Sequence, residues 1–207
     1  LEFRRVLFRS DPPFPLLVKI REGFGSRHIY RAENLHELEF FLEHTTVDSM
    51  VQEVCRGEEF SIDVFCDLEG RCLNAIPRTM IQSKGGESIK GMSLQDPELI
   101  GHGARVAEAI GIVGPANIQC FREADGSHRV TDVNARFGGA FPLPHAAGSG
   151  YPELALALAR GEQPADVAEQ ADASARQAHA ERHRAKRRTL IFRRTGARTV
   201  RLSLPGF

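Results

Sequence analysis

The pattern of apolar and polar positions predicts many short strands. Runs of apolar and β-branched residues, several alternating with polar ones, are bounded by Gly, Pro, Asp and Asn, which is typical of strands joined by tight turns. The expected strands are residues 14–20, 28–31, 50–54, 60–66, 71–78, 116–122 and 128–134. Residues 82–90, QSKGGESIK, are glycine-rich and mixed in charge, which favours a loop at the rim of a site.

Helices are predicted where apolar residues recur at helical spacing behind a capping residue. Asn34 and Glu37 form a capping-box pattern. Asp96 followed by Pro97 begins the clearest helix, and Gly111 ends it. The expected helices are residues 35–42, 97–110 and 151–160. Together with the strands they predict an α+β fold.

A β-hairpin over residues 116–134 brings the candidate chemistry together. Asp125-Gly126 suits the positive-φ positions of a two-residue type I′ turn. That turn would pair Gln119 with Asp132, Asn117 with Asn134, Ile118 with Val133, and Cys120 with Thr131. Because side chains alternate between the faces of a sheet, the carboxylate and amide groups of this hairpin would share one face.

This shared face suits a hard cation. Mg²⁺ prefers oxygen ligands, usually one or two carboxylates completed by water and phosphates. The alternative is an ordinary solvated face of an antiparallel sheet. Arg136, which follows on the same alternation and precedes Phe137-Gly138-Gly139, favours the site, because a cation beside an arginine suggests phosphate and glycines allow close backbone approach.

Lys19 lies within the apolar strand 14–20, where it either reaches the surface or meets an anion. The next turn, Gly23-Phe24-Gly25-Ser26, could fold its N–H groups over a phosphate, although an ordinary hairpin turn would look the same. A corner carrying Glu53 and Glu59 could hold an adenine edge and a ribose, and surface glutamates are the alternative.

Composition narrows the class of protein. The chain has 207 residues, of which 42% are hydrophobic, so it can bury a real core as one large domain or two small ones. No apolar run approaches the roughly 20 residues that cross a membrane. The four cysteines show no CxxC spacing, which favours buried reduced thiols over disulfides or zinc, and the expected location is cytoplasmic.

The net charge of zero conceals an asymmetry. Residues 176–207 hold ten of the 27 basic residues and only one of the 27 acidic residues, so the rest of the chain is acidic. A basic tail could bind nucleic acid, but disorder or translation outside the native reading frame is favoured, because the tail lacks periodicity. Residues 1–10, LEFRRVLFRS, also look foreign.

The order and spacing of these motifs resemble the ATP-grasp superfamily, in the branch similar to the carbamoyl-phosphate synthase large chain. The motifs are Lys19 with GFGS, then VQE and GEEF, then NIQ, and last DVNARFGG. The resemblance implies two α+β subdomains that grip ATP between mostly antiparallel sheets. It also implies that a carboxylate is joined to an amine through an acylphosphate, with ATP and Mg²⁺ as cofactors and release of ADP.

The resemblance also implies roles for single residues. Arg136 and Lys19 would be catalytic. The nucleotide would contact Lys19, Gly23, Gly25, Ser26, Glu53, Val54, Cys55, Glu59 and Arg78. The metal ligands would be Gln119, Asp132 and Asn134. The expected partners are small carboxylate and amine substrates, without membrane; nucleic acid is disfavoured, and a homodimer is left open.

The sequence departs from the family pattern in three ways. Asp132 stands where glutamate is usual, so its carboxylate reaches less far. His28 stands where glycine is common. Almost nothing precedes residue 14, where the family has a further α/β domain, so we expect a fragment whose own activity is left open. A non-catalytic nucleotide-binding module is the alternative function.

These expectations divide the chain into four parts: residues 1–13, a non-native or disordered leader; 14–57, the small subdomain with the glycine-rich cover; 58–165, the large subdomain with the metal site; and 166–207, a basic tail that is disordered or non-native.

Overall fold

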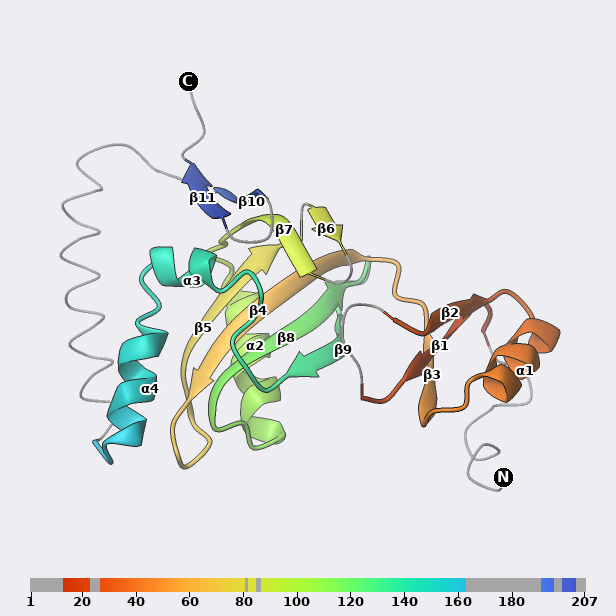
Figure 1. Cartoon of the computed structure of the whole chain (residues 1–207), viewed down its shortest axis with the longest axis horizontal. Coiled ribbons are helices and arrows are strands. Elements are labelled where there is room, and N and C mark those ends of the chain that lie inside the picture. The colour runs from red at the N-terminus through yellow and green to blue at the C-terminus, as the bar shows by residue number, and fades with distance from the viewer. Residues whose placement is uncertain are drawn as a thin grey trace. The chain divides into compact units, whose positions relative to one another are not determined.

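The computed structural model describes residues 13–22, 27–80, 82–84, 87–162, 191–195 and 199–203. The chain divides into two compact units, Leu1–Arg56 and Gly57–Phe207 (Figure 1). Within the described residues every pairing between strands is antiparallel, and helices pack on the sheets, so the predicted α+β fold is confirmed. No helix of the described part of the chain is long and apolar enough to cross a membrane.

The first unit is a small sheet covered on one face by a helix. Its strands are β1 (Leu16–Ile20), β2 (Ile29–Ala32) and β3 (Ser49–Glu53), in the order β2-β1-β3. Helix α1 (Leu35–His44) begins at Asn34, whose side chain accepts from the N–H of Glu37 as the capping box predicts. The core consists of Leu16, Val18, Ala32 and Leu38.

His28 adopts the left-handed backbone conformation, with φ of 56°. Few residues other than glycine take this conformation, because the Cβ atom approaches the backbone too closely. The resemblance leads us to expect glycine at this position, and the positive φ is a conformation that glycine adopts more easily than histidine. The imidazole Nδ1 lies 3.3 Å from the hydroxyl of Tyr30.

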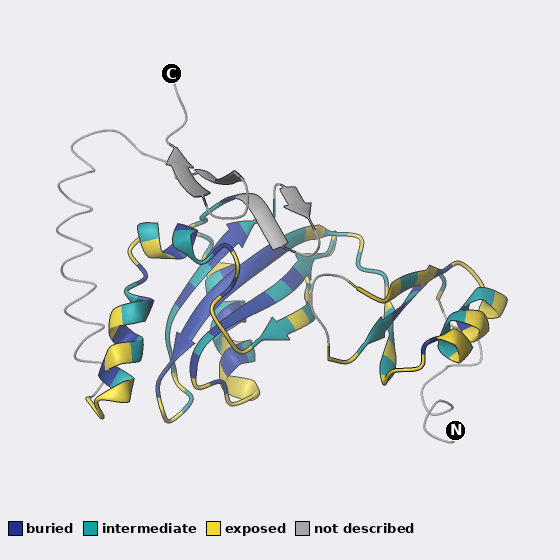
Figure 2. Cartoon of the chain, in the orientation of Figure 1, coloured by how far each residue is buried: buried dark blue, intermediate teal, exposed yellow. Residues whose placement is uncertain are grey.

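The second unit is built on a sheet with the strand order β5-β4-β8-β9. The strands are β4 (Glu58–Cys66), β5 (Cys72–Thr79), β8 (Gly114–Arg122) and β9 (His128–Asn134). Helix α2 (Pro97–Ala109), capped by Asp96, packs on the apolar face, where Gly103 lies against Ile62. Figure 2 shows that the middle of this sheet is buried while its rim is partly exposed.

Two shorter helices, α3 (Pro142–Ala146) and α4 (Tyr151–Ala159), pack at one end of the opposite face. Tyr151 and Leu154 of α4 form a core cluster with Phe65 of β4. The buried Tyr151 hydroxyl donates to the backbone oxygen of Asp63 at 2.8 Å. These contacts cover one end of this face and leave the side chains nearer β9 accessible.

A further sheet runs in the order β11-β10-β7-β6. Residues 82–90, predicted to be a loop, instead contribute β6 (Gln82–Lys84) and most of β7 (Glu87–Met92), so that prediction is wrong. Strands β10 (Ile191–Thr195) and β11 (Thr199–Ser203) fall within the segment predicted to be disordered or non-native. The prediction missed these strands because β7 pairs with β10, which is distant in sequence.

The loop of the β8–β9 hairpin differs from the predicted type I′ turn. It spans residues 124–126, closed by the N–H of Glu123 donating to the oxygen of Ser127 at 2.9 Å. Gly126 takes a positive φ of 81°, and Asp125 does not. A longer loop that ends in a left-handed glycine is a common alternative to the two-residue turn.

The longer loop shifts the pairing near the turn, and a β-bulge restores it farther along. Cys120 pairs with Val130, so the predicted pairing of Cys120 with Thr131 is wrong. The register shifts between Gln119 and Cys120, which leaves Thr131 as the extra residue of β9. Beyond the bulge, the predicted pairs of Gln119 with Asp132, Ile118 with Val133, and Asn117 with Asn134 are confirmed.

Candidate functional site

One face of the β5-β4-β8-β9 sheet is polar across all its strands. The pairing places Ser61 between Gln119 and Arg78, and Asp63 opposite Asn117. Since directly paired residues share a face, the polar face extends beyond the predicted hairpin. Its members are Glu59, Ser61 and Asp63 on β4, Arg78 on β5, Asn117 and Gln119 on β8, and Asp132 and Asn134 on β9.

The part of this face nearest β5 is a buried network of Ser61, Asp63, Arg78 and Asn117. The Arg78 Nε donates to Asp63 Oδ2 at 2.9 Å, and both side chains are only 2–3% exposed. The Asn117 amide donates to Asp63 Oδ1 at 2.9 Å and to the Ser61 hydroxyl at 2.8 Å. Each polar group therefore has a partner, which a buried ion pair requires if it is to be tolerated.

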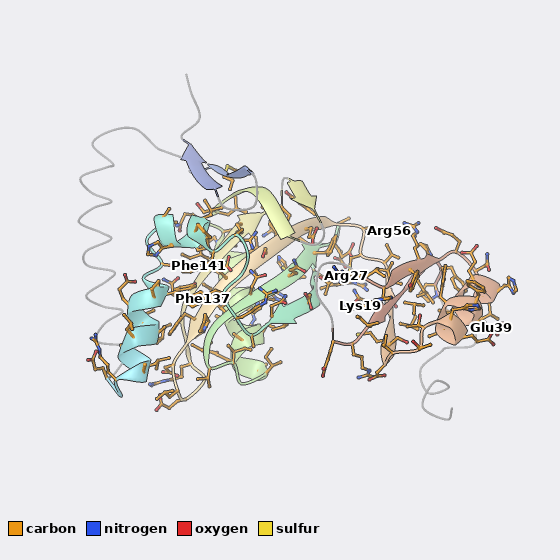
Figure 3. The ribbon with its side chains drawn as sticks, in the orientation of Figure 1. Lys19, Arg27, Glu39, Arg56, Phe137 and Phe141 are labelled. Atoms are coloured by element: carbon orange, nitrogen blue, oxygen red, sulfur yellow. The ribbon has the colours of Figure 1, made fainter. Side chains whose placement is uncertain are left out.

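The segment after β9 lies close over the buried network. A Cβ atom at Gly138 would lie 2.8 Å from Asp63 Oδ1 and 3.2 Å from the Asn117 amide, so only glycine fits this approach. Phe137 and Phe141 flank Gly138 in the sequence, and the centroids of their rings are 4.5 Å apart (Figure 3). The predicted close approach of backbone in Gly138-Gly139 is thus made at Gly138, against this chain's own Asp63.

The part of the face nearest solvent is a rim cluster of Asp132, Asn134 and Arg136. The Asn134 amide donates to Asp132 Oδ2 at 2.8 Å, and Arg136 donates to Asn134 Oδ1 at 3.1 Å. Arg136 also donates to the backbone oxygen of Phe137 at 3.0 Å. Asp132 and Arg136 are exposed, so this cluster, unlike the buried network, is accessible to a ligand.

The rim cluster with Gln119 has the donor chemistry of a magnesium site. Gln119 and Asp132 are direct partners across the strands, so their oxygens lie on one side of the sheet. One carboxylate with neighbouring amide oxygens fits Mg²⁺ that is also bound by phosphates. For Asn134 Oδ1 to join them, Arg136 must release it and is then available to an anion. Within the described residues no three His, Cys, Asp or Glu side chains form a metal-binding group.

Glu59, predicted to hold the ribose, lies half-buried on β4. Burial raises the pKa of its carboxyl, an effect that the positive charge of Arg78 offsets in part. Arg78, predicted to contact the nucleotide, is 3% exposed and bonded to Asp63. Arg78 could therefore act on a ligand only at a distance, through its positive charge, and not by direct contact.

The first unit carries the other predicted nucleotide contacts. Lys19 lies on β1, paired with Ile29 and Met50, and projects from the face opposite α1 (Figure 3). Glu53 ends β3, and Val54 and Cys55 follow it. The predicted cover, Gly23, Gly25 and Ser26, lies outside the described residues.

Sequence reasoning missed Ser61 and Asp63. Both stand in the run EEFSIDVFC, where polar residues alternate with buried Phe60, Ile62 and Val64. That alternation was the available signal, since it marks a polar face on a strand that is otherwise apolar.

The chain resembles known proteins in sequence and in fold. Residues 45–181 match the model of a family described as "ATP-grasp in the biosynthetic pathway with Ter operon". The carbamoyl phosphate synthase large chains of Thermoanaerobacter sp. (strain X514) and Caldanaerobacter subterraneus subsp. tengcongensis are 28% identical over 160 residues. The match covers 70% of this chain but only 15% of those proteins.

Two solved structures share the fold. Biotin carboxylase of Campylobacter jejuni, a β,γ-ATP complex, has a TM-score of 0.60 at 17% identity over 72% of this chain and 38% of its own. The biotin carboxylase domain of Hydrogenobacter thermophilus 2-oxoglutarate carboxylase, with MgADP, ADP and bicarbonate, has a TM-score of 0.58 at 18% identity over 72% and 37%.

Proposed function

We propose that this chain, which belongs to the ATP-grasp family, is the nucleotide-binding part of an ATP-dependent, ADP-forming ligase that joins a carboxylate to an amine through an acylphosphate. The family match over residues 45–181 confirms the resemblance inferred from motif order. Similarity to carbamoyl phosphate synthase large chains supports the class of reaction.

The observation that carries the proposal is the pairing of Gln119 with Asp132 beside Arg136. It offers a carboxylate, an amide oxygen and a guanidinium on one accessible sheet face. Phosphoryl transfer requires mainly positioning and positive charge near the moving phosphoryl group, so no nucleophilic side chain is needed. When bound, Mg²⁺ would neutralise charge on the phosphate oxygens.

In this proposal the residues keep the roles that the resemblance implies. Asp132, Gln119 and Asn134 hold the metal, and Arg136 steadies the phosphoryl group and the acyl substrate. Lys19 contacts the phosphates under the cover of Gly23, Gly25 and Ser26. The adenine contacts Glu53, Val54 and Cys55, and Glu59 holds the ribose. Arg78 adds positive charge from within the sheet.

The chain spans about 15% of the length of the curated relatives it matches. We expect the acyl and amine substrates to be selected outside the matched part, because one fold supports many substrates. The prediction that the protein is cytoplasmic forms part of the proposal. The domain limits 14–57 and 58–165 do so as well.

Thermal unfolding with Mg²⁺-ATP tests the proposal. A ligand at about a hundred times its Kd adds about 2.7 kcal/mol of stability, which raises Tm by roughly 5–10 °C for a chain of this size. Lys19→Ala and Asp132→Ala should each remove the shift. Arg21→Ala and Asp125→Ala change an exposed cation and an exposed carboxylate elsewhere and should keep it. No shift in the wild-type chain would contradict the proposal.

The alternative is a non-catalytic nucleotide-binding module. Both functions predict the Tm shift, so release of ADP separates them. A ligase should form ADP only when a carboxylate substrate is supplied. Binding of ATP without ADP for a panel of carboxylates and amines would favour the module.

A further inference from the structure

Two reduced cysteines face each other at the end of the β4–β5 hairpin. Cys66, the last residue of β4, pairs directly with Cys72, the first residue of β5. The Cys72 Sγ donates to the backbone oxygen of Asn74 at 3.4 Å, and both cysteines are reduced. Cys66 is fully buried, whereas Cys72 is partly exposed, so a small reagent can reach the pair through Cys72.

The backbone holds this pair at a separation that suits a disulfide. The hairpin is closed by the N–H of Asp67 donating to the oxygen of Arg71 at 2.9 Å. The N–H of Cys72 donates to Glu108 Oε1 at 3.1 Å, so it points away from β4. Cys66 and Cys72 therefore occupy a non-hydrogen-bonded position beside a register shift between Phe65 and Cys66. In regular pairs of this kind the Cα atoms lie about 4.5 Å apart and the side chains are closest.

That separation lies within the range of Cα–Cα distances in disulfides, about 4.4–6.8 Å. The adjoining turn is fixed by Asp67, whose Oδ1 accepts from the N–H of Arg71 at 2.7 Å. The strands on either side therefore need little movement for a bond between the two sulfur atoms.

The two thiols differ in reactivity. The neighbouring Cys66 thiol lowers the pKa of Cys72, whereas the neighbouring Cys72 together with burial raises the pKa of Cys66. The partly exposed sulfur is thus the one that becomes a thiolate more readily, and thiolates are the nucleophiles in thiol oxidation. Among the described residues no three His, Cys, Asp or Glu side chains are grouped so that they could hold a metal ion.

We propose that Cys66 and Cys72 are a redox modification site that forms a reversible intramolecular disulfide with a peroxide as oxidant. The Cys72 thiolate attacks one peroxide oxygen and becomes a sulfenic acid, with release of water after proton uptake. The Cys66 sulfur then attacks Cys72 and expels a second water. The two thiols lose two electrons and two protons, and hydrogen peroxide is reduced to two waters. A dithiol reduces the disulfide back to the two thiols.

The pair lies apart from the proposed nucleotide contacts, so the inference does not depend on the ligase proposal. Cys66 follows Asp63 on β4, and the Tyr151 hydroxyl bonds the backbone oxygen of Asp63. A disulfide would link β4 to β5 at the turn end of their hairpin, close in sequence to Asp63. We expect the oxidised chain to unfold at a higher temperature than the reduced chain.

Intact-mass measurement of the full chain after treatment with hydrogen peroxide tests the site. The expected result is a loss of about 2 Da, the mass of two hydrogens, with a peptide map that links Cys66 to Cys72 and full reversal by dithiothreitol. Cys55→Ser should behave like wild type, because Cys55 lies outside the pair. Cys72→Ser should keep its mass under the same treatment.

Several outcomes would overturn the inference. A link that includes Cys55 or Cys120, or oxygen addition to Cys72 without any link, contradicts a paired site. Cys66→Ser should show stable oxygen addition at Cys72 in place of the disulfide, and Cys66→Ala serves for the same measurement if the serine variant fails to fold. The wild-type mass and peptide map decide the matter without any variant.

Discussion

The buried network and the rim cluster lie on the same sheet face and use the same kinds of side chain. In the buried network, Asp63 is held by Arg78 and Asn117, and its side chain is 2% exposed. In the rim cluster, Asp132 contacts Asn134, which in turn contacts Arg136, and both charged ends are exposed. Each group thus joins an aspartate, an asparagine and an arginine.

The difference lies in what surrounds each carboxylate. Removing water makes an unpaired charge costly, so Asp63 must keep its partners. Asp132 remains hydrated and can exchange Asn134 for a cation at little cost. The buried network therefore stabilises the sheet, while the rim cluster is free to take part in binding.

Asp63→Ala should cause the largest loss of stability. It leaves the buried Arg78 guanidinium without its carboxylate and the Asn117 amide without an acceptor. Breaking a buried ion pair in this way costs about 3–5 kcal/mol. Urea unfolding at neutral pH measures the loss. A cost below about 1 kcal/mol would show that the pair is hydrated and that the two groups do not differ as described.

Gly138→Ala should have the next largest effect, because the added Cβ would meet Asp63 Oδ1 at 2.8 Å. Such overpacking costs about 1–3 kcal/mol. Gly101→Ala is the matched control: its Cβ would meet only the flexible Arg105 guanidinium at 3.2 Å, within helix α2. That change should stabilise by about 0.5–1 kcal/mol, since alanine favours a helix. If urea unfolding gives the same change in stability for both variants, Gly138 does not lie as close to Asp63 as described.

The rim cluster could be predicted from sequence because its residues belong to one hairpin. The turn was misjudged, yet Gln119 still opposes Asp132, because the longer loop and the bulge at Gln119–Cys120 cancel. A sequence does not reveal such compensation, since Asp125-Gly126 suits both kinds of loop. The predicted pairing is therefore correct only because two errors cancel: the loop is one residue longer than predicted, and the bulge was not predicted.

The buried network could not be predicted in the same way. Asp63 meets Asn117 only because β4 pairs with β8, and the two strands are separated by β5, β6, β7 and α2. No turn fixes a register across so long a connection. The loop prediction for residues 82–90 failed for a different reason. Strands β6 and β7 pair with each other, Gln82 with Lys90 and Lys84 with Glu87, in a segment whose glycines and mixed charges are typical of a loop. The α+β class of the fold could be predicted, because it follows from the local spacing of apolar residues and from the helix caps.

An ion pair of intermediate burial sharpens the comparison. Asp96 caps α2 and accepts from Arg122, and the two side chains are 24% and 29% exposed. The hydrogen bond from Arg122 lowers the pKa of Asp96 below its ordinary value of 3.8. The stability from this pair is therefore fully present above pH 3.8 and is lost as the pH falls through the lower pKa of the folded state.

Asp96→Asn tests this sign. Asparagine keeps the helix cap, so the variant should lose only the ion pair, about 0.5–1 kcal/mol at pH 7. The difference from wild type in urea unfolding should shrink as the pH is lowered below 3.8. A difference that grows on acidification would contradict the assigned pKa direction.

Asp132→Asn should have the smallest effect on the stability of the chain without nucleotide. The side chain is exposed, and an exposed substitution usually changes stability by no more than about 0.5 kcal/mol. The asparagine can still accept from Asn134, so the rim cluster should persist without its negative charge. Urea unfolding without nucleotide, beside the same change at Asp63, is the measurement. If Asp63→Asn and Asp132→Asn prove equally costly, burial does not separate the two groups; if only Asp132→Asn is mild, the outer carboxylate is free to bind a cation.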